Sequence, residues 1–400
     1  MKTDKQRIME ILDRGIIMQM LPTKDEFVEA LLQGKKLRFY IGADPTSSAL
    51  HLSHAKNYML LEEFRQLGHE VIVLIGDFTA RIGDPTERST ARKQLSREDV
   101  LKNVKSWLEQ IKPLMNFDDS LNPPRILYNN DWLAKLTMEE VINLASNVTA
   151  QQLLERDMFQ KRLKENKPIF LHEFMYPLMQ GFDSVAMDVD VELCGTDQIF
   201  NALMGRTLLK KLKNKDKFVI AVNLMENPKT NELMSKSRGT GIFLDSSPED
   251  MFGGIMAQPD EMIKVFLINN TRMPLEEIEK MSIEDNPLDA KMRTAFEITK
   301  IFHGELKAEV ARDIFVKKFQ KRETPDDLEI IKVDNNSISL FDILKKCLPK
   351  ISNSEIRRLI VQGGVKVSNQ TKNQFDEIIT IPKDGLVVKA GKRNWFKVVE

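Results

Sequence analysis

The fold is decided by the stretch Leu37-Arg-Phe-Tyr-Ile-Gly-Ala-Asp-Pro-Thr-Ser-Ser-Ala-Leu-His-Leu-Ser-His54. It begins with a short apolar run that favours a β-strand, and the Gly, Asp and Pro residues that follow favour a tight loop. A helical pattern of apolar residues starts near His51 and ends at Gly68, ahead of a second apolar run over residues 71–75. The stretch and its continuation therefore predict a right-handed βαβ unit with two parallel strands.

Two histidines, His51 and His54, open the predicted helix. Their spacing puts both on one face of the first turn, where unpaired backbone N–H groups and the helix dipole favour an anion. Imidazole donors at this place suit a phosphate group, although two His at helical spacing are more often ordinary surface or core residues. The nucleotide motifs G-x-G-x-x-G and G-x-x-x-x-G-K-[ST] do not occur, which argues against nicotinamide and P-loop enzymes.

The composition is that of a globular protein with more than one domain. The chain has 400 residues, 42% of them hydrophobic, which is enough for a sizeable core and for two or three domains. Its two cysteines, Cys194 and Cys347, form no C-x-x-C motif, so we expect neither a disulfide framework nor a zinc site. This usage fits a reducing cytoplasm. With no long apolar segment at the N-terminus, we also expect no secretion signal and no membrane span.

The balance of charges is uneven along the chain. Lys plus Arg and Asp plus Glu both number 59. Residues 337–400, however, carry twelve basic and six acidic side chains, a net charge of +6, which leaves −6 on the first 336 residues. A basic terminal module on an acidic body indicates a nucleic-acid partner.

Polar residues of the middle of the chain are placed where a ligand site is expected. The loop after the second strand, residues 76–85, brings Asp84 to the edge of the sheet, although Gly-Asp-Pro is also an ordinary turn sequence. Tyr176, Gln180 and Asp183 share one face of an otherwise apolar helix over residues 171–183. They either converge on a ligand or form internal hydrogen bonds, and the helix alone does not decide between the two.

Further along, the pattern predicts a second turn from strand to helix at the same sheet edge. Asp188, Asp190 and Glu192 alternate with apolar residues, which predicts a strand with one solvated face rather than a Mg²⁺ site. We therefore expect no protein-bound metal. Gly195-Thr-Asp-Gln198 follows the strand, and Lys236 lies in a long polar loop within Met-Ser-Lys-Ser. A mobile loop lysine can close over phosphates, but exposed loop lysines usually have no such role.

The remaining segments are predicted from their patterns as follows. Residues 116–170 are interpreted as an insertion with helices near 138–145 and 150–164, and a helical region runs from Ser247 to about Gln320. A linker is expected over residues 323–327. The basic module then has helices at 340–346 and 353–362 and several short strands, with Arg357, Arg358 and Lys366 expected to cluster where the second helix meets the first strand.

Taken together, these motifs resemble those of bacterial tyrosyl-tRNA synthetases, which are class I aminoacyl-tRNA synthetases. The resemblance rests on Tyr40-x-Gly-x-Asp-Pro-Thr, His-Leu-Ser-His, Ile-Gly-Asp-Pro, the Tyr/Gln/Asp helix, Gly-Thr-Asp-Gln and Met-Ser-Lys-Ser, in that order. It implies an α/β fold with a Rossmann-like catalytic domain (1–245) whose helical insertion (about 116–170) mediates homodimerisation. An α-helical anticodon-side domain (246–325) and an RNA-binding module of the S-four type (337–400) are implied to follow.

The resemblance also implies the roles of individual residues. The tyrosine phenol would be bound by Tyr40 and Asp183, and its ammonium group by Asp84, Tyr176 and Gln180. The ATP site would comprise Asp44, Thr46, His51, His54, Gly195, Asp197, Gln198 and Lys236, of which Thr46, His51, His54 and Lys236 would be catalytic. RNA binding would fall to Arg357, Arg358 and Lys366.

The chemistry implied is activation of L-tyrosine by ATP, followed by transfer to tRNA(Tyr). Attack of a carboxylate on the α-phosphorus needs no protein nucleophile, so His51, His54 and Lys236 are expected to supply positive charge. Asp183 is expected to act as a charged hydrogen-bond acceptor. Magnesium would arrive with ATP. The sequence departs from the family pattern at four positions: Ala43, Ser53, Cys194 and Leu233.

Two other functions fit part of the sequence. A tryptophan enzyme of the same fold is one, but Tyr40 and Asp183 would give a phenol two hydrogen-bonding partners. The other is an RNA-binding or regulatory protein that has lost the reaction, for which Ser53 and Leu233 are the support. Tyrosine-dependent exchange between ATP and pyrophosphate would separate all three.

Overall fold

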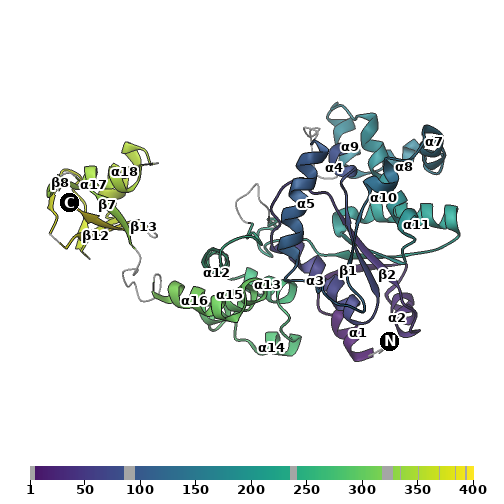
Figure 1. Ribbon diagram of the computed structural model, residues 1–400, viewed down its shortest axis with the longest axis horizontal. Helices are drawn as coiled ribbons and strands as arrows, with labels where there is room; N and C mark the ends of the chain where they lie inside the picture. The colour runs from purple at the N-terminus through teal and green to yellow at the C-terminus, as the bar shows by residue number, and fades with distance from the viewer. Residues whose placement is uncertain are drawn as a thin grey trace. The chain divides into compact units, whose positions relative to one another are not determined.

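The computed structural model describes residues 5–84, 95–234, 241–317, 328–333, 335–349, 351–368, 370–382, 384–391 and 394–400. The chain divides into two compact units, residues 1–312 and 313–400 (Figure 1). No helix in the described ranges is long and apolar enough to cross a membrane.

A six-stranded sheet organises the first unit, in the order β1-β6-β5-β2-β3-β4. The strands are β1 (Ile17–Leu21), β2 (Arg38–Ala43), β3 (Glu70–Ile75), β4 (Arg125–Tyr128), β5 (Val191–Gly195) and β6 (Phe218–Val222). Strands β2 to β6 pair in parallel, and β1 pairs with β6 in the antiparallel sense. The predicted parallel pair is confirmed, because β2 and β3 are neighbours in register.

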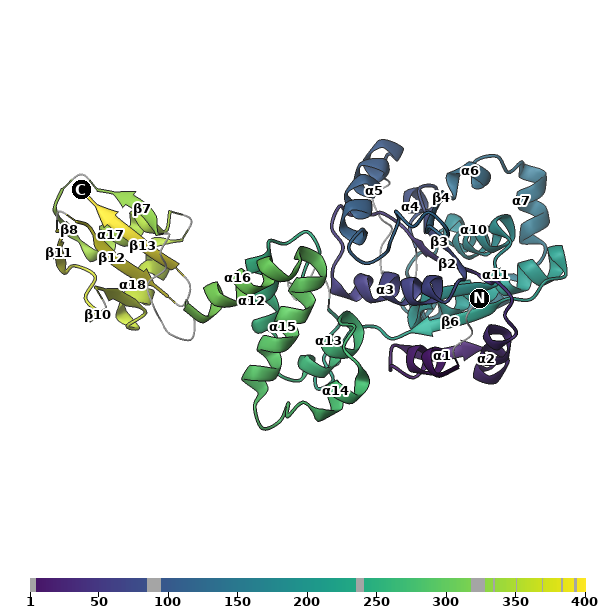
Figure 2. The same ribbon diagram turned by 60° about the horizontal axis from the view of Figure 1, so that its bottom comes forward.

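The central βαβ unit forms as the sequence predicts. Helix α3 (Leu52–Gln66) connects β2 to β3, and Gly68 follows it with φ of 95°, a conformation that glycine adopts readily. On one face of the sheet, the ring of Phe39 stacks on Phe64 of α3, with centroids 4.4 Å apart. On the other face, Tyr40 contacts α10 (Leu171–Met187). Both faces of β2 are therefore covered by helices (Figure 2).

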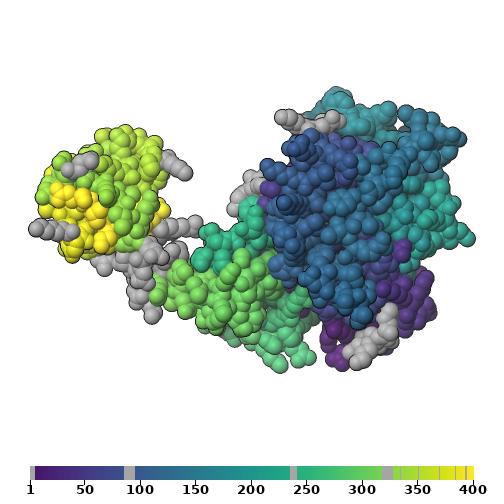
Figure 3. All heavy atoms as spheres, viewed as in Figure 1, coloured from purple at the N-terminus to yellow at the C-terminus, as the bar shows by residue number. Residues whose placement is uncertain are grey.

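The other helices of this part of the unit lie around the sheet. They are α1 (Lys5–Leu12), α2 (Lys24–Leu32), α4 (Thr79–Ile82), α5 (Arg97–Ile111), α6 (Asn130–Leu133), α7 (Met138–Ala145), α8 (Ala150–Leu154), α9 (Asp157–Lys164), the 3₁₀ turn η1 (Thr196–Gln198) and α11 (Ile199–Lys213). Ser96 caps α5 by accepting a hydrogen bond from the Asp99 backbone N–H. In the space-filling view, blue atoms of the α5 region cover much of the visible face of the unit (Figure 3).

Two interpretations of residues 116–170 need correction. Strand β4 lies inside this range but pairs with β3 in the central sheet, so the helices that leave the sheet begin only after Tyr128. The single helix expected over 150–164 is two helices, α8 and α9, separated by Arg156 in an extended conformation. The Arg156 guanidinium lies over the rings of Phe159 and Phe200, so tertiary contacts rather than a helix-breaking residue explain the interruption.

The structure confirms helices in the region that follows the sheet, as far as it is described, and its residues up to Arg312 belong to the first unit. Its helices are α12 (Pro248–Met256), α13 (Met262–Asn270), α14 (Leu275–Lys280), α15 (Pro287–His303) and α16 (Glu305–Phe315). Arg14 ties this region to the N-terminal segment, because its guanidinium donates to four backbone carbonyl oxygens between Leu267 and Met273. The linker expected over 323–327 lies outside the described residues.

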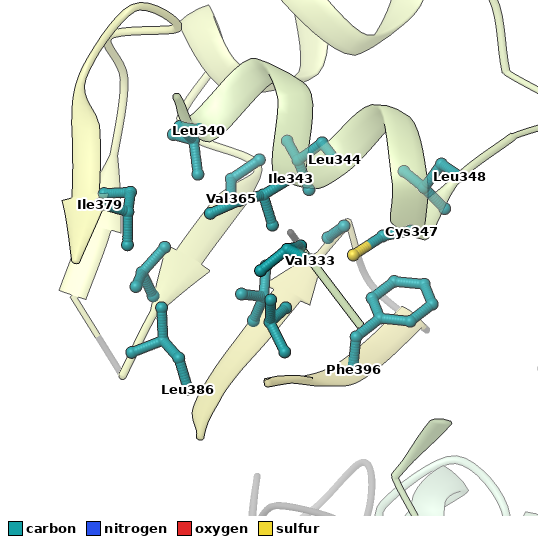
Figure 4. Close-up of a cluster of buried hydrophobic side chains, with 14 of the residues drawn as sticks. Val333, Leu340, Ile343, Leu344, Cys347, Leu348, Val365, Ile379, Leu386 and Phe396 are labelled. Carbon is teal, nitrogen blue, oxygen red and sulfur yellow. The ribbon is translucent and has the colours of Figure 1, made fainter. Parts of the chain in front are cut away.

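The second unit is a small α+β module with its own core. Its elements are β7 (Glu329–Lys332), β8 (Ser337–Ser339), α17 (Leu340–Cys347), α18 (Asn353–Val361), β9 (Val365–Val367), β10 (Gln370–Lys372), β11 (Ile378–Thr380), β12 (Leu386–Ala390) and β13 (Asn394–Val399). The side chains of α17 pack on Val365, Leu386 and Phe396 of the strands (Figure 4). Since β7 pairs with β13, the module's sheet begins before residue 337, earlier than the sequence suggested.

Candidate active site

A cavity of about 270 Å³ opens at the carboxyl ends of β2 and β5. The chain leaves β2 toward β3 on one side and β5 toward β6 on the other, so this is the point where the strand order reverses. Open parallel sheets bind their ligands at such a point. The cavity is lined by Tyr40, Ile41, Gly42, Ala43, Asp44, Thr46, His54, Asn57, Tyr58, Leu74, Gly76, Thr79, Asp84, Asn129, Tyr176, Gln180, Asp183, Glu192, Leu193, Cys194, Gly195 and Gln198.

Asp44, in the turn after β2, links that turn to α4 and to α10 at the carboxyl edge of the sheet. One carboxylate oxygen accepts a hydrogen bond from the Thr79 hydroxyl (2.6 Å), and the other accepts from the Tyr176 hydroxyl (2.9 Å). Gly76 leaves room for this contact, because a Cβ atom there would lie 2.0 Å from Asp44 Oδ1. The turn after β2 is thereby fixed against α4 and α10.

Asp183 is held by two neutral donors inside the protein. Its Oδ1 accepts from the Trp132 indole N–H (2.7 Å), and its Oδ2 accepts from the Asn129 amide (3.2 Å). Burial raises the pKa of Asp183 well above its usual range, and these two hydrogen bonds only partly oppose the effect. Burial thus works against the charged carboxylate expected from the sequence, while the two hydrogen bonds to its oxygens work in favour of it.

The two tyrosines of the cavity are both hydrogen-bonded and buried. The Tyr40 hydroxyl lies 2.9 Å from Ser184 Oγ, and the Tyr176 hydroxyl donates to Asp44. Burial raises the pKa of each phenol well above its usual range, and nearby carboxylates raise it further. Both hydroxyls therefore keep their protons.

Gln180 and Asp84 both line the cavity. The Gln180 side-chain amide donates to Glu192 Oε1 (3.1 Å), which leaves its amide oxygen as the acceptor for the cavity. Asp84 accepts a hydrogen bond from the Gln198 amide (2.7 Å). The cavity thus gathers hydroxyl, amide and carboxyl oxygens within one small space.

The solvated strand face expected for Asp188, Asp190 and Glu192 is absent from the described structure. Asp188 ends α10 in the left-handed conformation with φ of 52°, and β5 begins only at Val191. Glu192 is 2% exposed and forms an ion pair with the buried Lys217. The prediction fails because helices cover both faces of the sheet, so alternation of polar residues does not mark a wet face.

His51 and His54 stand at the start of α3, with their rings 4.0 Å apart. The backbone N–H of His51 donates to Nδ1 of His54 (3.2 Å), so the neutral His54 ring carries its proton on Nε2. Burial lowers the pKa of His51 to about 4 and that of His54 to about 3. Burial therefore works against the positive charge that the sequence led us to expect on these rings at neutral pH. Only His54 of the pair lines the cavity.

The turn after β5 brings three more of the expected residues to this edge. Gly195 lines the cavity, and a Cβ atom there would lie 2.3 Å from Asp197 Oδ1. Gln198 also lines the cavity, and its amide donates to Asp197 Oδ2 (3.1 Å). Asp197 itself is not among the residues that line the cavity. Lys236 falls outside the described residues.

Sequence reasoning missed several polar residues of the site, among them Thr79, Asn129, Trp132, Ser184 and Lys217. Asn129 and Trp132 come from an irregular stretch with no helical or strand periodicity, so nothing in the pattern marked them. Ser184 follows Asp183 directly, which was a signal, although a serine in an apolar helix is common. Lys217 gave none, because a lysine before a strand is normally exposed.

The three candidate RNA-binding residues do not share one face of the second unit. Arg357 and Arg358 belong to α18, and the Arg357 guanidinium lies over Phe341 and Phe375. Lys366 alternates with the buried residues of β9, so the strand pleat directs it to the face opposite the helices. The cluster expected at the helix–strand junction is therefore separated by the sheet.

On that opposite face, Lys366 stands in a basic row. It is directly across from Lys389 of β12, which in turn is across from Trp395 of β13. The Lys389 ammonium lies 4.6 Å from the centre of the Trp395 ring. Lys397 alternates with buried residues of β13 and points the same way. We call these four residues the basic sheet face.

The sequence matches the family described as tRNA synthetases class I (W and Y) over residues 32–320. It is 42% identical to a tyrosine–tRNA ligase of Carboxydothermus hydrogenoformans over 98% of each chain. It is 40% identical to a tyrosine–tRNA ligase of Thermotoga maritima, over 97% of this chain and 96% of the relative.

A solved structure shares the fold of a part of this chain that is about as long as the first unit. A C-terminally truncated mitochondrial tyrosyl-tRNA synthetase of Aspergillus nidulans superposes with a TM-score of 0.68 at 22% identity, covering 78% of this chain and 94% of the other. The site geometry, the family match and the near-complete coverage of the relatives all indicate the same family. This chain belongs to the tyrosine–tRNA ligases of the class I tRNA synthetase family.

Proposed function

We propose that this chain activates L-tyrosine with ATP and transfers it to tRNA(Tyr). The observation that carries the proposal is the cavity at the reversal of strand order, which is lined by Tyr40 and Asp183 together with His54 and Gly195. A polar amino-acid site and a helix N-terminus suited to phosphate thus adjoin each other. The tyrosine–tRNA ligases that are about 40% identical over nearly the whole chain support the same activity.

The tyrosine side of the cavity is assigned from its donors and acceptors. The phenol would lie between Tyr40 and Asp183, which both line the cavity. The ammonium group would bind the oxygens of Asp84, Tyr176 and Gln180, because an ammonium is a donor only. The Tyr176 hydroxyl keeps lone pairs for this contact while it donates its proton to Asp44.

The ATP side is assigned to the ends of β2 and β5. Asp44, Thr46, His51 and His54 would lie near the phosphates, and Gly195, Asp197 and Gln198 near the ribose. The tyrosine carboxylate attacks the α-phosphorus directly, so the protein acts by positioning and by hydrogen bonds to developing charge on phosphate oxygens. The Nε2 proton of neutral His54 suits that purpose. Magnesium would be carried by ATP, with its charge adding to that of the proposed loop residue Lys236.

The activity is tested by exchange of pyrophosphate into ATP in the presence of one amino acid at a time. Exchange with tyrosine and none with tryptophan is the expected result. Exchange with tryptophan alone would mean that tryptophan, and not tyrosine, is the amino-acid substrate. A chain that binds tRNA but exchanges with neither amino acid would be a regulatory RNA-binding protein.

The low histidine pKa values make a prediction about pH. Because both rings are neutral in the folded protein down to about pH 4, the rate of adenylate formation should show no histidine titration between pH 6 and 8. Below about pH 6.5, the two histidines bind protons in the unfolded chain but stay neutral in the folded protein. The free energy of unfolding should therefore fall as the pH is lowered from about 6.5 toward 4.

NMR of ¹⁵N-histidine-labelled protein measures the ring protonation directly, with His51→Gln and His54→Gln assigning the signals. A midpoint near pH 6.5 for either ring would contradict the neutral-donor assignment. Denaturant unfolding at several pH values checks the stability change.

We further propose that the second unit binds tRNA and that the basic sheet face is its contact surface. Lys366 and Lys389 lie directly opposite each other across two strands, so their two ammonium groups are placed on one face of the sheet, where a phosphate could contact both. Trp395 beside them offers a ring for base stacking. Arg357 and Arg358 would contribute from the helix side, where the former is already stacked on two phenylalanines.

Replacing Lys366 and Lys389 by glutamine in the full chain should weaken tRNA binding and leave tyrosine-dependent exchange unchanged. Each lost phosphate contact lowers the slope of log affinity against log salt by about 0.7–0.9. The control is Lys345→Gln with Lys346→Gln on α17, which removes the same charge from the other side. An equal loss in both double variants would mean general attraction rather than a defined contact face.

A homodimer is proposed from the exposed apolar residues of the insertion. Met138, Ile142 and Phe170 are large apolar side chains of the insertion that are 46–75% exposed in this chain alone, and the adjacent Leu171 is 77% exposed. Exposed apolar side chains gathered in one segment favour a protein interface. Sedimentation equilibrium of the wild type and of Leu171→Asp measures the association directly.

A cytoplasmic location is proposed from the thiols. Cys194 and Cys347 are both free and buried, one in each unit. Unpaired cysteines of this kind are usual where the environment is reducing.

A further inference from the structure

A buried ion pair reaches the wall of the cavity, because its carboxylate partner, Glu192, is one of the lining residues. Lys217, the residue before β6, is 1% exposed, and its ammonium donates to Ser184 Oγ (2.7 Å) and to the carboxylate of Glu192. Glu192 sits on β5 in register with Tyr40 of β2. Buried ion pairs contribute little net stability, so the position of this one calls for another explanation.

The pair connects to both ends of the proposed tyrosine site. At one end, Ser184 Oγ lies 2.9 Å from the Tyr40 hydroxyl. At the other end, Glu192 Oε1 accepts the Gln180 amide at 3.1 Å. The ion pair therefore contacts Ser184 at the phenol end of the site and Gln180 at the ammonium end.

The donors and acceptors of the network fix its direction. An ammonium only donates, so Ser184 Oγ is an acceptor toward Lys217 and has one proton left to give. Its acceptors within reach are the Tyr40 oxygen at 2.9 Å and Glu192 Oε2 at 3.4 Å, and the shorter contact, in which either hydroxyl can be the donor, favours the Tyr40 oxygen. The proton of Tyr40 is then free to face the cavity.

The packing around Lys217 is shaped to hold it. Gly205 of α11 faces the network, and a Cβ atom there would lie 2.6 Å from Lys217 Nζ and 2.7 Å from Ser184 Oγ. The ammonium also lies 5.5 Å from the centre of the Tyr40 ring. A glycine at this place gives the ammonium its space beneath the tyrosine.

We propose that Lys217 and Glu192 are positioning residues that set tyrosine specificity. Through Ser184 they turn the Tyr40 proton toward the oxygen of the substrate phenol, and through Gln180 they turn an amide oxygen toward the substrate ammonium. The inference rests on the proposed tyrosine activation. It adds to that function the groups that orient the site without touching the substrate phenol.

The test compares tyrosine and phenylalanine in ATP–pyrophosphate exchange by the full chain and by Lys217→Met. We expect kcat/KM for tyrosine to fall about 10- to 100-fold, mainly through KM, because misplaced binding groups lose effects of that size. Phenylalanine, which lacks the phenol oxygen, should lose less, so the ratio between the two amino acids narrows. The KM for ATP should stay unchanged.

Two further variants separate positioning from folding. Lys217→Met combined with Glu192→Leu removes both charges, so no unpaired charge stays buried, and the ratio should remain narrowed although thermal stability recovers. Arg162→Met breaks another buried ion pair of this unit, Arg162–Glu173, whose residues do not line the cavity. It should lower thermal stability and leave the ratio unchanged.

The outcomes are distinct. A wild-type ratio in the stable double variant, or equal losses for both amino acids in Lys217→Met, would make the pair merely structural and overturn the inference while tyrosine activation stands. Wild-type protein that fails to exchange with tyrosine would remove the proposed function and the inference together.

Discussion

Asp183→Ala is expected to lower tyrosine activation by about 100-fold without a matching loss for phenylalanine. A tyrosine pocket cannot exclude phenylalanine by size, so discrimination must come from polar groups that phenylalanine leaves without partners. Leaving one buried partner unsatisfied costs about 1–3 kcal/mol, and the upper end corresponds to about 100-fold. Asp183 is 2% exposed and lines the cavity beside Tyr40, so it belongs at that upper end.

The measurement is kcat/KM for exchange with each amino acid. Asp183→Ala also strands the Trp132 and Asn129 donors, which lowers stability whatever the substrate. Asp183→Asn, which is nearly isosteric and keeps an acceptor oxygen, should therefore fold better and still narrow the ratio. Equal losses for tyrosine and phenylalanine in both variants would mean that Asp183 serves only its two protein donors.

Periodicity and turn residues predicted the elements that place the site. The first strand, its helix and Gly68 follow from local patterns, and so do α5 with its Ser96 cap and the helices of the second unit. These features depend on a few neighbouring residues. The convergence of Tyr176, Gln180 and Asp183 on one cavity follows equally from helical spacing.

What the sequence could not predict depends on partners that are distant in the chain. Glu192 has the alternation of a solvated strand, but it is buried because helices cover both faces and Lys217 lies 25 residues away to neutralise it. Likewise, the interruption at Arg156 comes from aromatic rings that receive its guanidinium. The neutral state of the histidines follows from burial, which spacing does not reveal.

If the two histidines are neutral, the loop that follows β6 becomes the expected source of positive charge beside the phosphates. If His51 and His54 contribute N–H dipoles and no charge, positive charge beside the phosphates must come from magnesium and from basic side chains of that loop. The sequence has Leu233 where the resembling family has a first lysine, which leaves Lys236 of Met-Ser-Lys-Ser as the matching basic residue. Its role stays a prediction, because residues 235–240 lie outside the described structure.

Lys236→Ala is therefore expected to slow adenylate formation far more than it weakens tyrosine binding. Removing one donor to transition-state charge typically costs about 3 kcal/mol, or about 100-fold in rate. Single-turnover formation of the adenylate measures the rate, and equilibrium binding of tyrosine measures the ground state. The matched control is Lys229→Ala, since Lys229 lies in the same loop but pairs with Glu261 at the surface. A normal single-turnover rate in Lys236→Ala would contradict the assignment. The same loss of rate in Lys229→Ala would contradict it too, because only a lysine that contacts the phosphates in the transition state should change the rate when it is removed.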